Sequence, residues 1–420
     1  MSPELVSIIV LVAMFVVATV LPINIGVLAF VAAFVVGSVY TDLAGDEISA
    51  LFPGDLFVLL VGITFLFAIA QGNGTIDWIV AASVRAVRGR LVAIPWIMFA
   101  VAAIMTAVGA VSPGAVAILA PVALGVAARY GISQMLMGLM VVHGAQAGGF
   151  SPISVYGVIV NGVVARADLP TNPIALFLAS LVANLVIAIV VFFVFGGRAL
   201  LRRGRADPAV DDDADEEFAG ATLTREQAIT LTGLAVLAVA AVAFDLDVGL
   251  TAFAVALVLA LVSPDAHKQA MNKVAWSVVV LVGGVLTYVG VMQEIGTIDY
   301  VGNAVASLAA PLLVALLLCY IGGIVSAFAS SVAILGATIP LAIPFLQDGQ
   351  IGAVAMIAAL AVSSTVVDCS PLSTNGALVL ANSVNVDRDV FFRRLLAYGA
   401  VVVAAAPPLI WLAFVVPTTQ

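Results

Sequence analysis

Two short polar segments interrupt otherwise apolar stretches of this 420-residue sequence. The first, at residues 148–154, reads GGFSPIS, and the second, at residues 368–375, reads DCSPLSTN. Both contain Ser-Pro, and proline removes a backbone donor and pushes the preceding residue out of helical geometry. Each segment is therefore predicted to break a helix, leaving free carbonyl groups before the break and free N–H groups after it. Carbonyl and hydroxyl oxygens suit Na⁺, whereas N–H groups at a helix start suit an anion.

The composition indicates that these breaks lie in a membrane. Hydrophobic residues make up 64% of the chain and charged residues 9%, compared with about 45–50% and about 25% in soluble domains. A soluble enzyme, a nucleic-acid-binding protein and a disordered protein are therefore excluded. We expect a multi-pass protein of the cell (inner or plasma) membrane, which contacts the lipid bilayer and no nucleic acid.

Apolar segments long enough to cross a bilayer follow one another along the chain, since a transmembrane helix needs about 17–25 residues. Two further apolar stretches, 91–129 and 309–346, pass through small residues at 110–114 and 327–331. Each is predicted to be a hairpin that spans twice or dips in and returns. The other spans are predicted near residues 5–21, 25–40, 56–71, 135–164 (interrupted), 173–195, 228–244, 248–262, 276–292, 351–380 (interrupted) and 391–415.

The sequence also contains an internal duplication. Segments 25–30, 74–78, 116–119 and 151–154 match segments 248–253, 296–300, 332–335 and 370–373. Each half has five spans and one hairpin, and a hairpin returns to its starting side, so each half crosses the membrane an odd number of times. We therefore predict an all-α polytopic membrane protein of two inverted-topology repeats, each with five transmembrane helices, one re-entrant helical hairpin and an interrupted helix. This is an architecture of secondary transporters.

The basic residues support this arrangement. Counting spans places 14 of the 15 Lys and Arg residues on one face of the membrane and only Arg166 on the other. Because Lys and Arg concentrate in cytoplasmic loops, we expect the first face to be cytoplasmic and both termini to lie outside. The net charge is −9, and much of the acid lies at 211–217, within the predicted cytoplasmic linker 198–226.

Asp368 is the one carboxylate predicted deep in the membrane, where ionisable groups are costly and usually functional. It could ligate a cation, carry a proton or cap a half-helix. Gly149 takes the equivalent position in the first half. Asn375 favours substrate contact because an amide both donates and accepts, and its first-half counterpart is Tyr156. His143 could pack through hydrogen bonds or relay protons.

Other chemistries are not indicated by the sequence. It contains no Walker loop for ATP, and no HExxH, GxSxG or Cys/His cluster typical of proteases and metalloenzymes. Cys319 and Cys369 lie in apolar or broken-helix contexts, which predicts neither a disulfide framework nor a metal site. We expect no enzyme activity and no cofactor, with Na⁺ as the coupling ion.

The run LFVLLVGITFLF at residues 56–67, followed by GTID at 74–77, resembles the N-terminal region of MatC-type malonate/dicarboxylate carriers. These belong to the ion transporter superfamily, alongside the divalent anion–sodium symporters, and the resemblance covers the layout of the whole chain. In the symporters each hairpin tip carries Ser-Asn-Thr. Here the tips read Ser-Pro-Gly at 112–114 and Ser-Ser-Val at 330–332, so only the leading serine is kept.

The resemblance also implies a homodimer in which a fixed scaffold carries a moving transport part. Two stretches that follow the third span of each half are predicted to be helices in the membrane interface, and by the resemblance they are hinge arms. The expected scaffold parts are 1–72 and 227–294, the arms 73–90 and 295–308, and the transport parts 91–197 (hairpin 91–130) and 309–420 (hairpin 309–346).

Together, the residues and the resemblance predict a symporter that imports a small dicarboxylate, such as malonate or succinate, with Na⁺ or H⁺ by an elevator-type movement. Alternatives are a cation/proton antiporter or an oxyanion efflux permease of the same superfamily and, from a different class, an ion channel. One cation is expected near Ser112, Gly149 and Ser151, and a second near Ser330, Asp368 and Ser370. The expected substrate contacts are Ser112, Ser154, Ser330, Ser373, Thr374 and Asn375.

Overall fold

The computed structural model describes residues 2–21, 23–41, 43–86, 90–204, 222–244, 246–298, 300–301, 311–327, 331–347 and 351–418. Within these residues every regular element is a helix, which confirms the predicted all-α class. Six helices are long and apolar enough to cross a membrane, and further apolar helices have 10–17 residues. The chain is therefore a multi-pass membrane protein.

Among the described residues, the first half contains eleven helices and follows the predicted order of spans, hairpin and broken helix. They are α1 (Pro3–Val20), α2 (Ile25–Tyr40), α3 (Gly45–Ala50), α4 (Gly54–Gly72), α5 (Thr75–Ala86), α6 (Ala93–Ala107), α7 (Ser112–Tyr130), α8 (Gln134–Gly148), α9 (Val155–Arg166), α10 (Pro173–Val194) and α11 (Gly197–Arg203). Helices α6 and α7 form the predicted hairpin, and α8 and α9 are the two pieces of the interrupted span. Helix α5 lies in the predicted arm 73–90.

The second half repeats this order. Its helices are α13 (Arg225–Ala243), α14 (Val248–Val262), α15 (Pro264–Lys273), α16 (Trp276–Glu294), α18 (Pro311–Ser326), α19 (Ser331–Gln347), α20 (Ala353–Val366), α21 (Thr374–Ala381), α22 (Arg388–Phe414) and the short 3-10 helix Val416–Thr418. Most of the predicted arm 295–308 lies outside the described residues. The short helices α3 and α15, which precede the third span of each half, were not predicted, because neither has the apolar length of a span.

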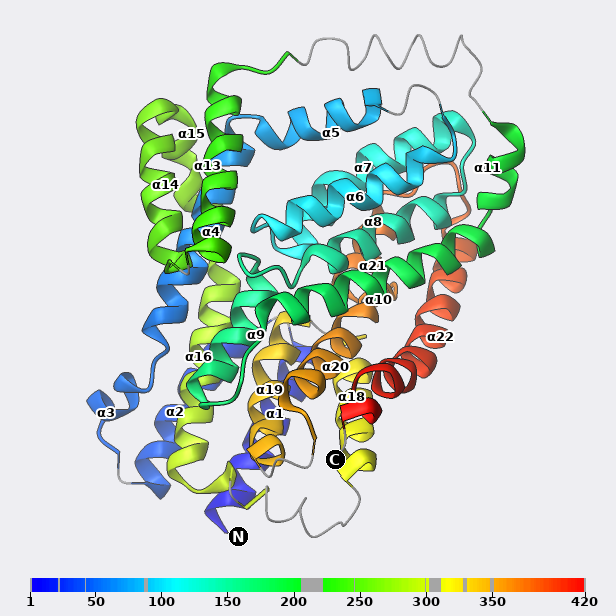
Figure 1. The fold of residues 1–420 in the computed structure, drawn as a ribbon. Helices are drawn as coiled ribbons and strands as arrows, with labels where there is room; N and C mark the ends of the chain where they lie inside the picture. Colours follow the sequence, from blue (N-terminus) through cyan, green and yellow to red (C-terminus); the bar gives the residue numbers. More distant parts are fainter. Residues whose placement is uncertain are drawn as a thin grey trace.

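The halves are related by an inversion. Helix α1 starts at the lower end of Figure 1 and α13 starts at the upper end, so the two repeats run in opposite directions. Helices α2, α4, α7 and α9 of the first half correspond to α14, α16, α19 and α21 of the second. Each contact between the halves therefore occurs twice: α2 packs on α16 as α14 packs on α4, and α7 packs on α21 as α19 packs on α9. The backbone repeats as well, since Gly74 and Gly296 have φ +76° and +81°, and Asp168 and Asn385 both have φ +54°.

Both termini lie at the same end of the molecule, and α11 and α15, which carry basic residues, lie at the opposite end (Figure 1). This agrees with the odd number of crossings predicted for each half. Which end faces the cytoplasm stays a prediction.

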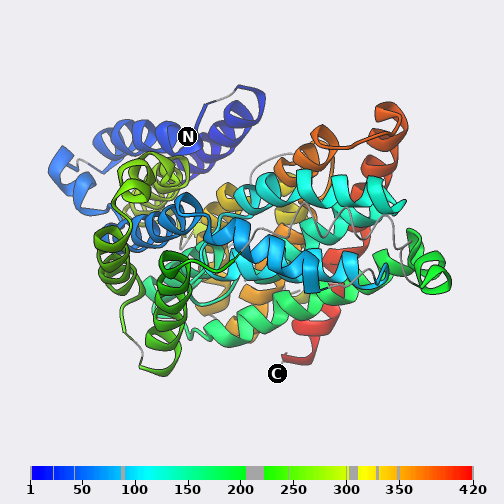
Figure 2. The same ribbon diagram turned by 90° about the horizontal axis from the view of Figure 1, so that it is seen from above.

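The helices form two bundles, seen side by side in Figure 2. The first bundle contains α1–α4 and α13–α16, and the second contains α6–α10 and α18–α22. The bundles meet where α4 contacts α9 and where α16 contacts α19. Apart from the first two residues of α13, the first bundle lies by residue number within the ranges expected for the scaffold, and the second within those expected for the transport part. That the two bundles act as scaffold and transport part stays a prediction.

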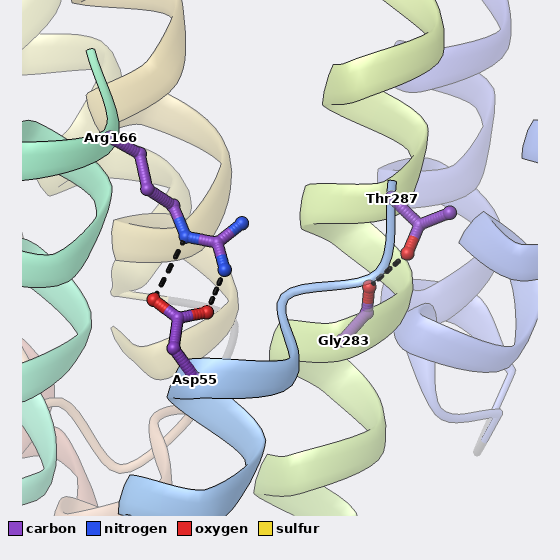
Figure 3. A network of polar contacts seen from close by, with 4 residues as sticks. All are labelled: Asp55, Arg166, Gly283 and Thr287. Atoms are coloured by element: carbon purple, nitrogen blue, oxygen red, sulfur yellow. Dashed lines mark hydrogen bonds and ion pairs between the residues drawn. The ribbon is translucent and has the colours of Figure 1, made fainter. Parts of the chain in front are cut away.

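An ion pair joins the bundles at the end where α9 finishes. Arg166 of α9 donates from Nε and Nη2 to the two carboxylate oxygens of Asp55 in the first turn of α4 (Figure 3). In the same view, Thr287 caps the backbone carbonyl of Gly283 within α16. The side chains of Arg166 and Asp55 are 39% and 61% exposed, so the pair contributes at most about 1 kcal/mol to stability.

Glycines allow the helices of the first bundle to cross at close range. A Cβ atom on Gly284 of α16 would lie 2.0 Å from the carbonyl oxygen of Gly26 in α2, and a Cβ on Gly26 would lie 2.1 Å from that of Val280. Small residues at such crossings let backbones approach, which is how helices associate in lipid. The reciprocal pair Gly26 and Gly284 therefore fixes the α2–α16 contact.

Gly284→Ala should lower the free energy of unfolding by about 1–3 kcal/mol, because the added methyl group must push two backbones apart. Denaturant unfolding of the purified protein in detergent measures this. Gly125→Ala in α7 is the matched control, because its new Cβ meets nothing within 4 Å. Equal loss of stability in the two variants would contradict the proposed close crossing.

Candidate functional site

Four helix N-termini converge between the repeats. Helices α7 and α19 begin at the hairpin tips with Ser112 and Ser331, and α9 and α21 begin just after the two breaks. The side-chain amide of Asn375 in α21 donates to the Ser112 hydroxyl over 2.9 Å. The side chain of Tyr156 in α9 interacts with both Ser112 and Ser331. One polar cluster thus contains the start of each half-helix, and each start carries a partial positive charge.

Asp368 lies within this cluster, just before α21, and is 1% exposed. Its Oδ1 accepts from the backbone N–H of Asn375 over 3.1 Å, and its Oδ2 accepts from the Asn375 side-chain amide over 3.0 Å. The Ser331 hydroxyl donates to Oδ2 over 3.2 Å, and the side-chain amide of Gln146 lies 3.5 Å from the same atom. A helix start and three side chains therefore stabilise the carboxylate.

Basic side chains do not supply this stabilisation in the described part of the chain. The hydrogen-bond partners of the Asp368 carboxylate among the described residues are Asn375, Ser331 and Gln146, all of them neutral. Burying a carboxylate without a cationic partner is expensive. Hydrogen bonds and the dipole of α21 offset some of that cost, and a cation or a proton on Asp368 would offset more, so Asp368 is a candidate binding site for either.

The two broken segments are held by the same serine contacts. Ser154 and Ser373 donate through their hydroxyls to the carbonyls of Ser151 and Ser370, each over 2.8 Å. Their backbone N–H groups bond to the same carbonyls over 3.0 Å. These contacts satisfy backbone groups that a break would leave free in lipid. Ser154 and Ser373 therefore close the two loops, which is a different use of their hydroxyls from the predicted substrate contact.

The groups predicted for the first cation already have partners within the protein. The Ser151 hydroxyl donates to the carbonyl of Ala107. The Gly149 carbonyl accepts from the Ser154 hydroxyl and from the N–H of Gly157. Ser112 accepts from Asn375, as described above. The second break differs, because there Asp368 adds a charge.

The remaining predicted residues have different surroundings. Ser330 lies outside the described residues. The Ser370 hydroxyl accepts from the backbone N–H of Leu372 over 3.1 Å, within its own loop. Thr374, the first residue of α21, is exposed, whereas its neighbour Asn375 is fully buried. Among the predicted site residues, Asn375 thus links the two repeats, because it contacts both Asp368 and Ser112 directly.

Two residues of the cluster were not predicted as ligands. Gln146 lies two residues before the first break and is fully buried, and Ser331 is the neighbour of Ser330, the serine predicted as a ligand. An uncharged amide within an apolar span was the available signal for Gln146. For Ser331, two adjacent hydroxyls offered no means of choosing between them.

Two side-chain oxygens of the cluster are buried without a partner among the described residues. They are Oε1 of Gln146 and Oδ1 of Asn375. Both residues are 0% exposed. An unsatisfied buried acceptor costs about 1–3 kcal/mol, so these atoms mark a place where a cationic or hydrogen-bonding ligand would be stabilised.

His143 lies one turn before Gln146 and binds two neighbouring helices. Its Nδ1 lies 3.0 Å from Oδ1 of Asn184 in α10, and its Nε2 lies 2.6 Å from the Tyr398 hydroxyl in α22. Because the Asn184 amide nitrogen donates to the Ser180 carbonyl over 3.0 Å, the Asn184 oxygen faces His143 and His143 donates from Nδ1. This is the hydrogen-bonded packing role considered from the sequence.

Comparison with known proteins identifies the N-terminal region. Residues 1–149 match the family model described as the dicarboxylate carrier protein MatC N-terminus. This confirms the MatC resemblance predicted from residues 56–77. Curated proteins provide no match.

Solved structures show the fold. The crystal structure of the Alcanivorax borkumensis YdaH transporter, described as having an unusual topology, matches with a TM-score of 0.58 at 17% sequence identity. The match covers 88% of this chain and 89% of that one. At this identity the likeness concerns the fold alone. The match of residues 1–149 to a carrier family, rather than the likeness of fold, indicates a transporter and not an enzyme.

Gly376→Ala should destabilise the second break, because the added Cβ would lie 1.9 Å from the carbonyl oxygen of Ser370. We expect a loss of about 1–3 kcal/mol, measured as the unfolding free energy in detergent. Gly157→Ala, which meets the Ser151 carbonyl at 2.1 Å, should behave alike. Gly336→Ala is the control, because its nearest contacts are at 4.0 Å. The close packing of the loops would be refuted if all three variants matched the native protein.

Proposed function

We propose that the protein is a secondary active transporter that imports a small dicarboxylate, such as malonate or succinate, together with Na⁺ or H⁺. The observation that carries this proposal is the convergence of four helix N-termini on one buried carboxylate between inverted repeats. Helix starts bind anions, and Asp368 binds a cation or a proton. One site can therefore hold both members of a symport pair.

The anion would bind on the exposed side of the cluster. Thr374 and Gly114 are exposed residues in the first turns of α21 and α7, and the contact from Asn375 to Ser112 holds these turns together. A carboxylate placed there can accept from N–H groups of two helices and from the Thr374 hydroxyl. Contact with the substrate also stays a prediction for Ser330 at the second tip and for Ser154 and Ser373 in the loops.

Electrostatics supplies a reason for coupling. A substrate carboxylate bound about 5 Å from ionised Asp368 would be repelled by about 3 kcal/mol at an effective dielectric constant of about 20. A cation or proton on Asp368 removes that repulsion. The substrate and the coupling ion would therefore stabilise each other's binding, which is the thermodynamic requirement for symport.

Alternating access would follow from movement of the second bundle against the first. Inverted repeats supply two arrangements of similar energy, and the bundles meet at limited contacts, such as α4 with α9 and α16 with α19. In this elevator-type mechanism, α5 and the segment 295–308 are hinge arms, and the first bundle forms the interface of a homodimer. The linker 198–226 would face the cytoplasm, with both termini outside.

Uptake into proteoliposomes tests the function. Labelled malonate or succinate should accumulate when a Na⁺ or H⁺ gradient is imposed, and a thermal-shift series with malonate, succinate, malate and citrate ranks the substrates. Cation flux that dicarboxylates do not stimulate would instead support a cation/proton antiporter. Equal uptake with and without a Na⁺ gradient would exclude Na⁺ coupling.

Asp368→Asn should abolish cation-driven accumulation while leaving dicarboxylate exchange measurable, because the neutral amide no longer repels the anion. The initial rate with and without the gradient measures this. Loss of pH dependence would indicate that Asp368 carries a proton, whereas a weakened response to Na⁺ would indicate a ligand. Asp265→Asn is the control, since its side chain is 96% exposed. Undiminished gradient-driven accumulation in Asp368→Asn would rule out this role.

Thr374→Val should raise the substrate KM by about tenfold or more, because a hydrogen bond to a charged group is worth about 1.5–3 kcal/mol. Uptake rates over a range of substrate concentrations measure KM and the maximal rate separately. Thr232→Val provides the control, because this exposed threonine of α13 bonds to the Ala228 carbonyl in its own helix. An unchanged KM in Thr374→Val would remove this residue from the substrate site.

A further inference from the structure

Arginines of both repeats gather where the end of α10 and the helix α11 meet the start of α22. The segments 197–203 and 387–394 contain six arginines and two aspartates, which gives this region a net charge of +4. Several of these arginines are exposed and have no hydrogen bond or ion pair among the described residues. They include Arg198 and Arg202 of α11, and Arg393 and Arg394 of α22.

The local structure of α11 turns its arginines outward. Gly196 has φ +119°, a conformation that favours glycine, and it lets the chain change direction where α10 ends. The buried residues of α11 are Gly197 and Leu200. Arg198 and Arg202 are four residues apart and therefore share one face of the helix. This face is exposed, so both guanidinium groups can reach a partner outside the protein.

A contact between two aromatic rings brings the arginines of the two repeats together. The ring centroids of Phe195, at the end of α10, and Tyr398 of α22 lie 5.8 Å apart. Arg198 follows Phe195 by three residues, which is about one helical turn of 5.4 Å. Arg394 precedes Tyr398 by four residues, again about one turn. Because α11 and the start of α22 both lie on the right in the upper part of Figure 1, both turns lead the same way, and the arginines flank one junction.

Beyond these arginines, α10 and α22 expose apolar surface. In their apolar windows only 28% and 33% of the residues are buried inside the protein. Val194 of α10 is 66% exposed and Val401 of α22 is 64% exposed. In a membrane such surfaces contact acyl chains, and basic residues at the ends of the helices lie at the depth of the lipid headgroups. The junction thus has a cationic part beside an apolar part, as an anionic phospholipid requires.

Phosphate is the anion that these side chains suit best. The planar guanidinium group of arginine donates two parallel hydrogen bonds to phosphate oxygens. Of the two aspartates, Asp387 accepts from the backbone N–H groups of Asp389 and Val390 at the start of α22, so its carboxylate already has partners there. Two pairs of arginines on two helices match a headgroup with two phosphates. Basic pockets between membrane helices bind headgroups of this kind.

We propose that the junction of α10, α11 and α22 binds one membrane lipid with two phosphate groups, of the cardiolipin type. One phosphate lies against Arg198 and Arg202 of the first repeat, and the other against Arg393 and Arg394 of the second. The acyl chains contact the exposed faces of α10 and α22. The junction contains none of the residues that bond to Asp368, so this site does not depend on the proposed transport function.

Native mass spectrometry of the purified full chain in detergent tests the site. Cardiolipin, phosphatidylglycerol and phosphatidylcholine with the same acyl chains are titrated separately, and the dissociation constant of the first bound lipid is measured. Cardiolipin should bind as one saturable copy, at least tenfold more tightly than phosphatidylglycerol, because two phosphates contact two arginine pairs. Equal affinities for the two anionic lipids, or no saturable cardiolipin, would overturn the proposal.

The double variant Arg198→Gln/Arg394→Gln should weaken cardiolipin binding about 25-fold, or about fivefold for each arginine near an anionic headgroup. It should also remove the preference over phosphatidylglycerol. Lys268→Gln/Lys273→Gln is the matched control, because it makes the same change of charge on two exposed residues of α15. Equal losses of affinity in the two double variants would show a general attraction to positive charge and would refute the assigned site.

A second variant separates the lipid from another anionic occupant. The acidic residues at 211–217 follow α11 in the sequence and lie outside the described residues. They are replaced by Asn and Gln in the full chain, and the cardiolipin titration is repeated. The dissociation constant should change less than twofold. Cardiolipin binding that occurs only after this replacement would show that the chain's own acidic residues occupy the arginines, and the lipid site would be rejected.

Discussion

The buried carboxylate of Asp368 is the constraint on which the centre of this protein depends. Hydrogen bonds from Asn375, Ser331 and Gln146 stabilise it, and these residues come from both repeats. The charge can stay at this depth only if half-helices begin there with free N–H groups, and half-helices can begin there only if the breaks are buried in protein. The hairpins and the breaks supply the helix starts, and the repeat interface buries the breaks in protein.

Symmetry of the backbone and asymmetry of the side chains have different consequences. The loops after α8 and α20 share their serine contacts and their glycine packing, at Gly157 and Gly376. A near-symmetric frame gives two arrangements of similar energy, which alternating access requires. The side chains at equivalent positions, such as Gly149 and Asp368, are not alike. The backbone is therefore near-symmetric between the repeats, whereas the buried charge among the described residues lies in the second repeat only.

Much of the fold was predictable because lipid imposes simple rules on sequence. Apolar length marks spans, Ser-Pro marks breaks, and matched segments mark the inverted repeat; helices α8, α9, α20 and α21 confirm the two broken spans. The short helices α3 and α15 were missed, since neither is long and apolar. Within the site, Asp368 and Asn375 were predictable as polar residues at a break. Gln146 was not, because its role depends on an approach between repeats that no local pattern records.

Sequence by itself determined the membrane class, the duplication and the likeness to MatC at the N-terminus, because these follow from composition and order along the chain. Tertiary structure decided which polar groups meet. Ser112 contacts Asn375, Ser331 contacts Asp368, and Ser154 and Ser373 turn inward to their own loops. The reason is geometric: Ser112 and Asn375 are 263 positions apart and meet only when the inverted halves pack.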